Sequence, residues 1–339
     1  MKKRLLFLLV VLSLTLMLCM TSYAMDGSGT ENDPYIVKTA EDFIAIKNNL
    51  SAHYKLDADI SASSTTGAIV EGTFSGVFDG NGHKITVNID APTDKSGDTF
   101  DAVFGVVTGT IKNLTVDGNV SGSNKVAGVV GKLYNNGKII NCVNYATIYG
   151  RKNVAGITGV AFNDAQVINC INFGNISGKA INNGVDMGGI VGCIWNASSS
   201  KTYIINCSNA GDLNGDGGNV GGICGLMESG KISGCFNAGT VTAKQNAGTL
   251  LGGAQNNNQV TISGYMSVVE GRYVGSNNTV YYGSEMLEST GVAIYLGSGS
   301  GIRGEFHMNT AILTILHAFS LIQQLNMAQS YQQSQSLLH

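Results

Sequence analysis

The sequence of 339 residues contains little proline and little charge. Proline occurs twice, at Pro34 and Pro92, and charged residues make up 13% of the chain, about half of their usual share in soluble proteins. The formal net charge is -3, and no basic patch of the kind that a nucleic acid or an anionic membrane surface requires stands out. We therefore expect no nucleic acid among the partners.

Glycine is abundant instead, with 46 residues in the chain. These glycines have no three-residue period, which excludes a collagen helix. The hydrophobic content of 43% is sufficient for a core and excludes a chain that is disordered throughout.

Residues 1–24 have the pattern of a secretory signal peptide. A basic start at residues 2–4 precedes an apolar run over residues 5–20, and the small residues Ser22 and Ala24 suit signal peptidase. We predict cleavage after Ala24 and a secreted or cell-surface location, with an uncleaved membrane anchor as the alternative. No later stretch reaches the roughly 18 apolar residues of a spanning helix, so we expect no membrane span after cleavage.

The middle of the chain is repetitive. The first glycine of a G-x-x-G pair recurs at Gly128, Gly156, Gly189 and Gly222, at spacings of 28, 33 and 33 residues. Each copy holds three β-type segments separated by Gly/Asn turns, as in VAGVVGKL, KIINCVNY and ATIYG of residues 126–150. Three strands in about 28 residues favour a β-solenoid over a propeller blade of about 40 residues. The predicted fold is an all-β parallel β-helix with three strands per coil.

Equivalent positions of the repeats form columns of like residues. Strict alternation along the first strand predicts inward columns of apolar side chains, namely Val129, Ile157, Ile190 and Ile223, and Leu133, Ala161, Ile194 and Met227. A third apolar column comprises Ile148, Ile176, Leu213 and Val241. Stacked columns of this kind bury a continuous core that no single repeat could form.

Two further columns consist of asparagine and cysteine. Asn144, Asn172, Asn209 and Asn237 recur two residues after a cysteine, and we interpret them as a structural ladder in which each amide bonds the next one. The cysteines are Cys142, Cys170, Cys207 and Cys235. They act either as buried thiols or as the disulfides Cys142–Cys170 and Cys207–Cys235, because neighbouring coils lie at a suitable distance. The spacing does not fit a zinc site, so we predict no metal.

The ends of the chain differ from the middle. Residues 39–50 begin with Thr39-Ala40-Glu41-Asp42, which predicts an N-capped helix near residues 40–50 within an N-terminal cap of residues 25–55. The parallel β-helix is expected over residues 56–296, with the clearest repeats at 126–265. Residues 297–339 are predicted to form an irregular or helical tail, which either covers the last coil or is unrelated to the fold.

The repeats resemble the GLUG motif of bacterial exported and surface proteins. The resemblance is carried by GGIVG at residues 188–192, the N-C-x-N segments, and upstream GTENDPYIVKTAEDFIAI, YKLDADI and GTFSGVFDGNGHKI. It covers about residues 27–265 and implies a right-handed parallel β-helix in adhesin-like proteins. Such repeats also occur beside the protease unit of IgA-cleaving metallopeptidases. That unit needs an H-E-x-x-H site, which this sequence lacks, and the resemblance implies no catalytic residues and no cofactor.

Acidic residues do not recur at a repeat position. Between residues 121 and 267 they are Asp164, Asp186, Asp212, Asp216 and Glu228, whereas a β-helix lyase or hydrolase needs clustered acids. The segment Asp79-Gly80-Asn81-Gly82 is interpreted as a tight turn, with a calcium loop as the alternative. Asp57 and Asp59 share a strand face and are assigned solvated or turn-capping roles.

The outward face of the first repeat strand provides the candidate binding residues. The same alternation places two largely apolar columns outward, Val130, Thr158, Val191 and Cys224, and Lys132, Val160, Cys193 and Leu226. Beyond them lie Tyr134, Phe162 and Trp195, an aromatic column across three coils. Such a column offers a platform for sugar rings or a protein partner, unless another segment packs over it.

Three functions remain open at this point. The first is an exported, noncatalytic, adhesin-like surface protein that binds a glycan or a host or envelope protein. The second is a carbohydrate-active β-helix enzyme, such as a polysaccharide lyase or hydrolase. The third is a structural component of the envelope without a ligand.

Overall fold

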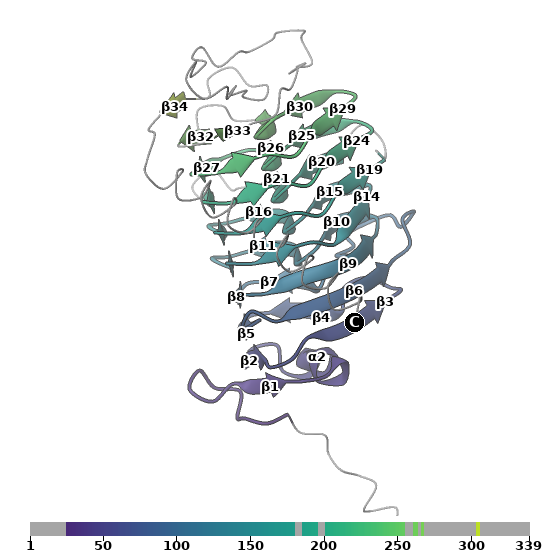
Figure 1. The fold of residues 1–339 in the computed structure, drawn as a ribbon, viewed down its shortest axis with the longest axis vertical. Helices are drawn as coiled ribbons and strands as arrows, with labels where there is room; N and C mark the ends of the chain where they lie inside the picture. The colour runs from purple at the N-terminus through teal and green to yellow at the C-terminus, as the bar shows by residue number, and fades with distance from the viewer. Residues whose placement is uncertain are drawn as a thin grey trace, which may run out of the picture.

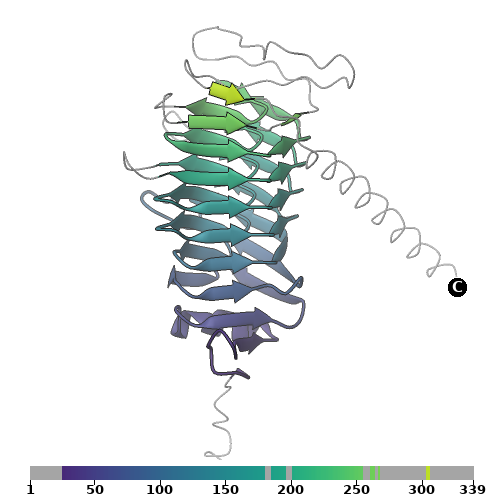
Figure 2. The same cartoon turned by 90° about the vertical axis from the view of Figure 1, so that its left-hand side faces the viewer.

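The computed structural model describes residues 25–179, 185–195, 201–254, 260–263, 266–267 and 303–305. These residues form a stack of parallel strands around one elongated core (Figures 1 and 2). Each strand pairs with the equivalent strand of the next coil, as in the register Leu133–Ala161–Ile194. The pairing is parallel because successive coils cross each face in the same direction. The predicted signal peptide and the helix predicted after residue 305 lie outside the described residues.

Four sheets make up the walls of the stack. In spatial order, the 10-stranded sheet contains β1 (Tyr35–Val37), β2 (His53–Leu56), β5 (Val77–Asp79), β8 (Thr110–Lys112), β12 (Lys138–Ile140), β17 (Gln166–Ile168), β22 (Thr202–Ile205), β27 (Gly230–Ser233), β32 (Val260–Ser263) and β34 (Arg303–Glu305). The five-stranded sheet contains β10 (Asn124–Ala127), β15 (Lys152–Ala155), β20 (Val185–Gly188), β25 (Gly218–Gly221) and β30 (Asn246–Gly248).

The other two walls are the 7-stranded and the 12-stranded sheets. The 7-stranded sheet contains β31 (Leu251–Ala254), β26 (Cys224–Met227), β21 (Val191–Ile194), β16 (Thr158–Phe162), β11 (Val130–Tyr134), β7 (Phe104–Val107) and β4 (Val70–Phe74). The 12-stranded sheet contains β29 (Val241–Ala243), β24 (Leu213–Gly215), β19 (Ile176–Gly178), β14 (Thr147–Gly150), β9 (Thr115–Ser121), β13 (Val143–Asn144), β18 (Ile171–Asn172), β23 (Ser208–Asn209), β28 (Phe236–Asn237) and β33 (Met266–Ser267), with β6 (Lys84–Asp90) beside β9 and β3 (Ile60–Ser64) beside β6.

Each repeat contains five short strands where the sequence predicted three. In the first repeat these are β10 to β14. A bend at residues 128–129 divides the first predicted segment, and Asn141, with a positive φ of 54°, divides the second. Asparagine tolerates this left-handed backbone better than other non-glycine residues.

The N-terminal end of the stack carries a short helix (Figure 1). The helix α2 (Ala40–Ala45) continues into the 3-10 helix η1 (Ile46–Asn48) and begins with a capping box between Thr39 and Asp42. Phe43 is buried and lies edge-on to Phe78 and Phe104, at centroid distances of 5.5 and 5.6 Å. The parallel stack begins at β1, inside the range predicted as a cap, because β1 pairs with β2.

The core contains the predicted inward columns and one column that was predicted to face outward. Ile157, Ile190 and Ile223 are fully buried at stacked positions. Val130 and its equivalents Thr158, Val191 and Cys224 are also fully buried, so the outward assignment of this column was wrong. The bend between β10 and β11 interrupts the alternation, and Val129 and Val130 both lie in the main core.

A ladder of buried asparagine amides runs along the axis. The Nδ2 atoms of Asn144, Asn172 and Asn209 donate to the Oδ1 atom of the next asparagine, at 2.8, 2.7 and 2.8 Å. Each of these Nδ2 atoms also donates to the backbone carbonyl oxygen of the residue two positions later in the chain. For Asn172 this acceptor is the carbonyl oxygen of Gly174. Every donor of these buried side chains therefore has a partner, which removes the cost of burying an amide.

The two glycines of the G-x-x-G pair make room for two different neighbours. A Cβ atom on Gly156 would lie 2.2 Å from Oδ1 of Asn172, the ladder residue of the same repeat. A Cβ atom on Gly192 would lie 2.8 Å from the backbone nitrogen of Val154 in β15. The motif therefore allows the chain to fold tightly against the amide ladder and against the five-stranded sheet.

Candidate functional site

The predicted aromatic column begins with a stacked pair. Tyr134 at the end of β11 and Phe162 at the end of β16 are register partners. Their ring centroids are 5.4 Å apart and their planes differ by 18°. Nζ of Lys132 lies 4.9 Å from the Tyr134 centroid and 5.1 Å from the Phe162 centroid, within range of a cation–π contact with both. All three residues are half-buried, so each presents part of its surface to solvent.

Trp195 continues the column but has different contacts. It follows β21 directly, and its backbone nitrogen donates to the carbonyl oxygen of Ala161. Its half-buried ring lies 5.9 Å from Nζ of Lys125, and the same ammonium lies 5.3 Å from the ring of Phe100. The rings of the column therefore share one wall but not one uniform stack.

The aromatic rings cover a second, smaller hydrophobic cluster. Val160, Cys193 and Leu226 form it on the outer side of the 7-stranded sheet, with Phe162 and Trp195 packed against it. Val160 and Cys193 were predicted to lie on the outward side, with cover by another part of the chain as the alternative, and their full burial corresponds to that alternative. Alternation assigned these residues to the correct side of the sheet, but it could not reveal that other side chains cover them.

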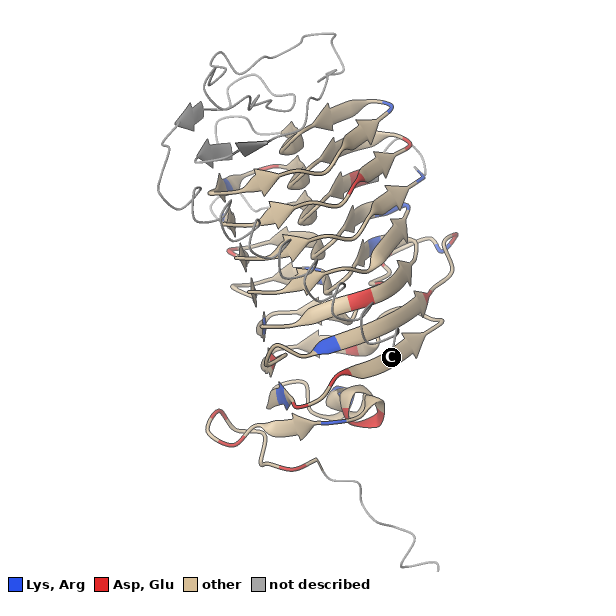
Figure 3. Cartoon of the chain, viewed as in Figure 1, with Lys and Arg blue, Asp and Glu red and all other residues tan. Residues whose placement is uncertain are grey.

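Lys125 and Asp98 were missed by sequence reasoning and stabilise this wall. The side chain of Lys125 is 4% exposed and forms an ion pair with the carboxylate of Asp98. This hydrogen bond from Lys125 lowers the pKa of Asp98, although burial partly opposes the shift. Asp98 precedes β7 and Lys125 lies in β10, and no local motif joins them. Figure 3 shows that charge is sparse along the strands.

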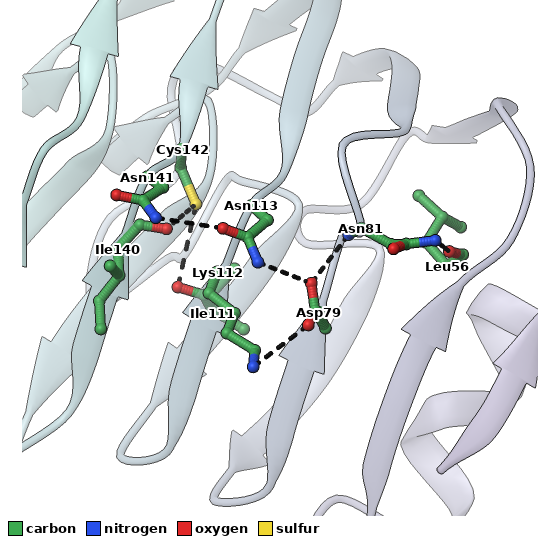
Figure 4. Close-up of polar contacts among 9 residues, drawn as sticks. All are labelled: Leu56, Asp79, Asn81, Ile111, Lys112, Asn113, Ile140, Asn141 and Cys142. Carbon is green, nitrogen blue, oxygen red and sulfur yellow. Dashed lines mark hydrogen bonds and ion pairs between the residues drawn. The ribbon is translucent and has the colours of Figure 1, made fainter.

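The segment 79–82 is a turn held by protein donors (Figure 4). Oδ1 of Asp79 accepts from the backbone nitrogen of Asn81 and from Nδ2 of Asn113, both at 2.9 Å. Its Oδ2 lies 3.1 Å from Nζ of Lys112. Both carboxylate oxygens are therefore engaged, which favours the turn over the calcium loop. Across the described part of the chain, no three or more His, Cys, Asp or Glu residues are grouped to hold a metal ion.

Asp59 has a similar capping role, which is one of the two roles predicted for it. Its Oδ1 accepts from the backbone nitrogen of Lys84 at 3.0 Å and lies 3.2 Å from Nδ1 of His83. The hydrogen bond from the Lys84 backbone and then that from His83 lower the pKa of Asp59. This carboxylate thus fixes the start of β6.

A second asparagine ladder, which the sequence reasoning missed, lies on the outside of the coils. Nδ2 of Asn141 donates to Oδ1 of Asn113 at 3.2 Å, and Nδ2 of Asn169 donates to Oδ1 of Asn141 at 3.1 Å; Figure 4 shows the first of these bonds. The first asparagine of N-C-x-N is thus the positive-φ residue of a turn. In the fourth repeat Gly234, with φ 65°, takes the same place.

The cysteine column is buried and holds free thiols. Cys142, Cys170, Cys207 and Cys235 are at most 1% exposed, and each is unpaired in the structure. Sγ of Cys142 approaches the carbonyl oxygen of Ile140 at 3.5 Å (Figure 4). Burial, followed by contacts with neighbouring thiols, raises the pKa of Cys142 and Cys207. These thiols therefore fill the core as small apolar groups.

A second aromatic pair lies on the outer face of the 12-stranded sheet. Tyr145, which follows β13, stacks on Phe173, which follows β18, with centroids 4.9 Å apart and planes 9° apart. Tyr145 is 41% exposed and Tyr149 of β14 is 36% exposed. The sequence signal was available, because an aromatic residue follows the ladder asparagine in the first two repeats, V-N-Y and I-N-F.

Comparison with known proteins shows similarity mainly in the fold. No protein-family model matches the chain. Halomucin of Haloquadratum walsbyi is 30% identical over 146 residues, covering 31% of this chain and 2% of halomucin. The chain thus corresponds to a very small part of that relative. A crystal structure from Bacteroides ovatus, described as a candidate immunoglobulin A1 protease, has a TM-score of 0.63 and 21% identity, covering 85% of this chain and 89% of that one.

The described residues contain one α-helix, α2, of six residues. No helix in this part of the chain has the length and hydropathy that crossing a bilayer requires.

Proposed function

We propose that this chain is an exported, noncatalytic surface protein whose β-helix binds glycans through the wall of Lys132, Tyr134 and Phe162. The proposal includes removal of the signal peptide after Ala24 and right-handed coils, as the GLUG resemblance implies. The similarity to part of halomucin and the fold shared with the Bacteroides ovatus protein support a place among exported or surface proteins. Adhesin-like binding to a host or envelope surface would follow from glycan recognition.

The observation that carries this proposal is the Tyr134–Phe162 stack with Lys132 beside it. The two rings stack on each other and are half-buried, so the part of the pair that remains exposed offers an apolar surface against which the C–H face of a sugar can pack. The Lys132 ammonium has three donors that reach hydroxyl or carboxylate oxygens at the rim of the ring. Phe162 packs against the buried Val160–Cys193 cluster, and a ring that is positioned before binding lowers the entropic cost of binding.

A glycan array with the mature protein tests the proposal. We expect binding to one class of glycan and a roughly tenfold loss of affinity in Phe162→Ser, because an aromatic contact contributes about 0.5–1.5 kcal/mol beyond its buried area. Phe162→Tyr keeps the ring and should retain binding. Ile44→Ser, which changes an exposed residue on α2, is the matched control. Absence of any ligand, or unchanged binding in Phe162→Ser, would contradict the proposal and favour a structural envelope component.

The same samples separate binding from catalysis. The bound glycan is incubated with the protein and its chain length is measured by mass spectrometry. A noncatalytic module leaves the chain length unchanged. Shortened or unsaturated products that persist after repurification would establish the carbohydrate-active enzyme instead.

A further inference from the structure

A second surface differs from the proposed wall in position and in chemistry. We name it the Tyr145 platform and define it as Tyr145, Phe173, Asn175, Asp212 and Tyr149. It lies on the outer face of the 12-stranded sheet, whereas Tyr134 and Phe162 belong to the 7-stranded sheet. The proposed wall and this platform are therefore built from separate strands of the same coils.

The centre of the platform is an exposed aromatic stack. The rings of Tyr145 and Phe173 are almost parallel, with planes 9° apart and centroids 4.9 Å apart, which matches the rise of about 4.8 Å between paired strands. Three large hydrophobic residues of the described chain are exposed, and Tyr145 and Tyr149 are two of them. Phe173 is half-buried, whereas Tyr145 and Tyr149 are exposed, so core packing does not account for the two tyrosines and exposed aromatic rings of this kind mark recognition surfaces.

Polar side chains follow the stack in the chain, since Asn175 comes two residues after Phe173 and Asp212 is hydrogen-bonded to it from the next coil. Oδ1 of Asn175 accepts from the backbone nitrogen of Asp212 at 3.0 Å, and Oδ1 of Asp212 accepts from the backbone nitrogen of Thr240 at 2.9 Å. Both side chains are exposed. These two backbone hydrogen bonds hold both side chains in place, and Nδ2 of Asn175 and Oδ2 of Asp212 remain able to bond a ligand.

The charge of the platform favours an uncharged ligand. Asp117, whose charge acts on the Tyr145 hydroxyl, is paired with Lys84 at 3.5 Å. Burial, and then the charge of Asp117, raise the pKa of the Tyr145 hydroxyl, which stays protonated and able to donate. Asp212 is the one charged residue among the five of the platform, so an anionic chain would meet a net negative surface.

We propose that the Tyr145 platform is a second glycan site that takes a neutral polysaccharide. One sugar ring packs against the solvent-exposed part of the Tyr145–Phe173 pair, and its hydroxyls bond Nδ2 of Asn175 and Oδ2 of Asp212. A few aromatic groups with a small number of well-placed polar groups are the pattern of a small-ligand site. A protein partner would need a larger buried apolar centre than one aromatic pair and Tyr149 provide.

Affinity electrophoresis of the mature protein in gels containing soluble mannan, β-glucan or xylan tests this inference. We expect retardation by at least one of these neutral polymers and a roughly tenfold weaker affinity in Tyr145→Ser. Tyr145→Phe should keep the affinity within a few fold, since it retains the ring. Asp212→Asn preserves the acceptor for Thr240 and should not change the salt dependence, because the ligand is neutral.

Two controls make the outcome specific to this surface. Phe162→Ser removes a ring from the other wall and should leave neutral-glycan binding unchanged, so the two proposals fail independently. The exposed Tyr145→Ser variant should unfold at the wild-type midpoint. Retardation by none of the neutral polymers, or wild-type affinity in Tyr145→Ser, would overturn the inference. So would a wild-type dimer that Tyr145→Ser disperses in light scattering, because the platform would then be an interface between copies.

Discussion

Replacement of Asn172 by alanine is the most direct test of how the coils are held together. Asn172 is fully buried in the middle of the amide ladder. Its Nδ2 atom donates to Oδ1 of Asn209 at 2.7 Å and to the carbonyl oxygen of Gly174 at 2.9 Å. Its Oδ1 atom accepts from Nδ2 of Asn144 at 2.8 Å. Asn172→Ala therefore removes three hydrogen bonds and leaves all three partners inside the stack.

The expected loss of stability follows from these orphaned partners. A buried donor or acceptor without a partner costs about 1–3 kcal/mol. Three of them predict a decrease of about 3 kcal/mol or more in the free energy of unfolding. Gly156→Ala disturbs the same amide from the opposite side, since the added Cβ would lie 2.2 Å from Oδ1 of Asn172, and we expect it to be destabilising as well.

Chemical denaturation provides the assay, followed by far-UV circular dichroism and by the fluorescence of Trp195, the single tryptophan of the chain. The control is Asn214→Ala, which changes an exposed asparagine of β24 and should cost less than about 0.5 kcal/mol. If Asn172→Ala costs no more than this control, the ladder does not stabilise the fold and the reasoning is refuted.

Two further predictions concern the thiols and the turn at Asp79. The six cysteines of residues 25–339 are buried and free, so a thiol reagent should label none in the native protein and six after unfolding; an intact mass lower by two hydrogens per pair would instead show disulfides. For Asp79, burial raises the pKa, but hydrogen bonds from Asn113, Asn81 and Lys112 outweigh it and leave the pKa below 3.8. Because the pKa of Asp79 is lower in the folded chain than in the unfolded chain, ionised Asp79 stabilises the fold at any pH above the pKa of the unfolded chain. This stabilisation is lost as the pH falls through the pKa of the folded chain. Asp79→Ala should therefore be less stable than wild type at neutral pH, and a gap in melting temperature that fails to narrow in acid would contradict this assignment.

Much of the architecture could be predicted because its causes repeat along the chain. The inward columns at Ile157 and Ala161 follow from residues of one kind at one repeat position, and the structure stacks them in register. The capping box at Thr39 could be recognised because a helix start depends on four consecutive residues. The columns depend on a periodic pattern and the capping box on a local one, and both kinds of pattern can be recognised in a sequence.

The surroundings of Tyr134 and Phe162 could be predicted only in part. The register neighbours Tyr134 and Phe162 could be inferred from the repeat. The burial of Val160 and Cys193 could not, because it depends on rings that fold over them. The ion pair of Asp98 with Lys125 joins residues 27 positions apart without a motif. Such contacts depend on how one loop lies across the next coil.

The sequence by itself determined that like residues meet along one axis, because a repeat of 28 to 33 residues brings each position over its equivalent in the next coil. The tertiary structure alone decided which faces are covered. Val130 is buried because the chain bends after Gly128, whereas Tyr145 is exposed on the outer side of its sheet. Alternation along a strand determines which side chains share a face of the sheet. Whether that face is exposed depends on which other parts of the chain pack against it.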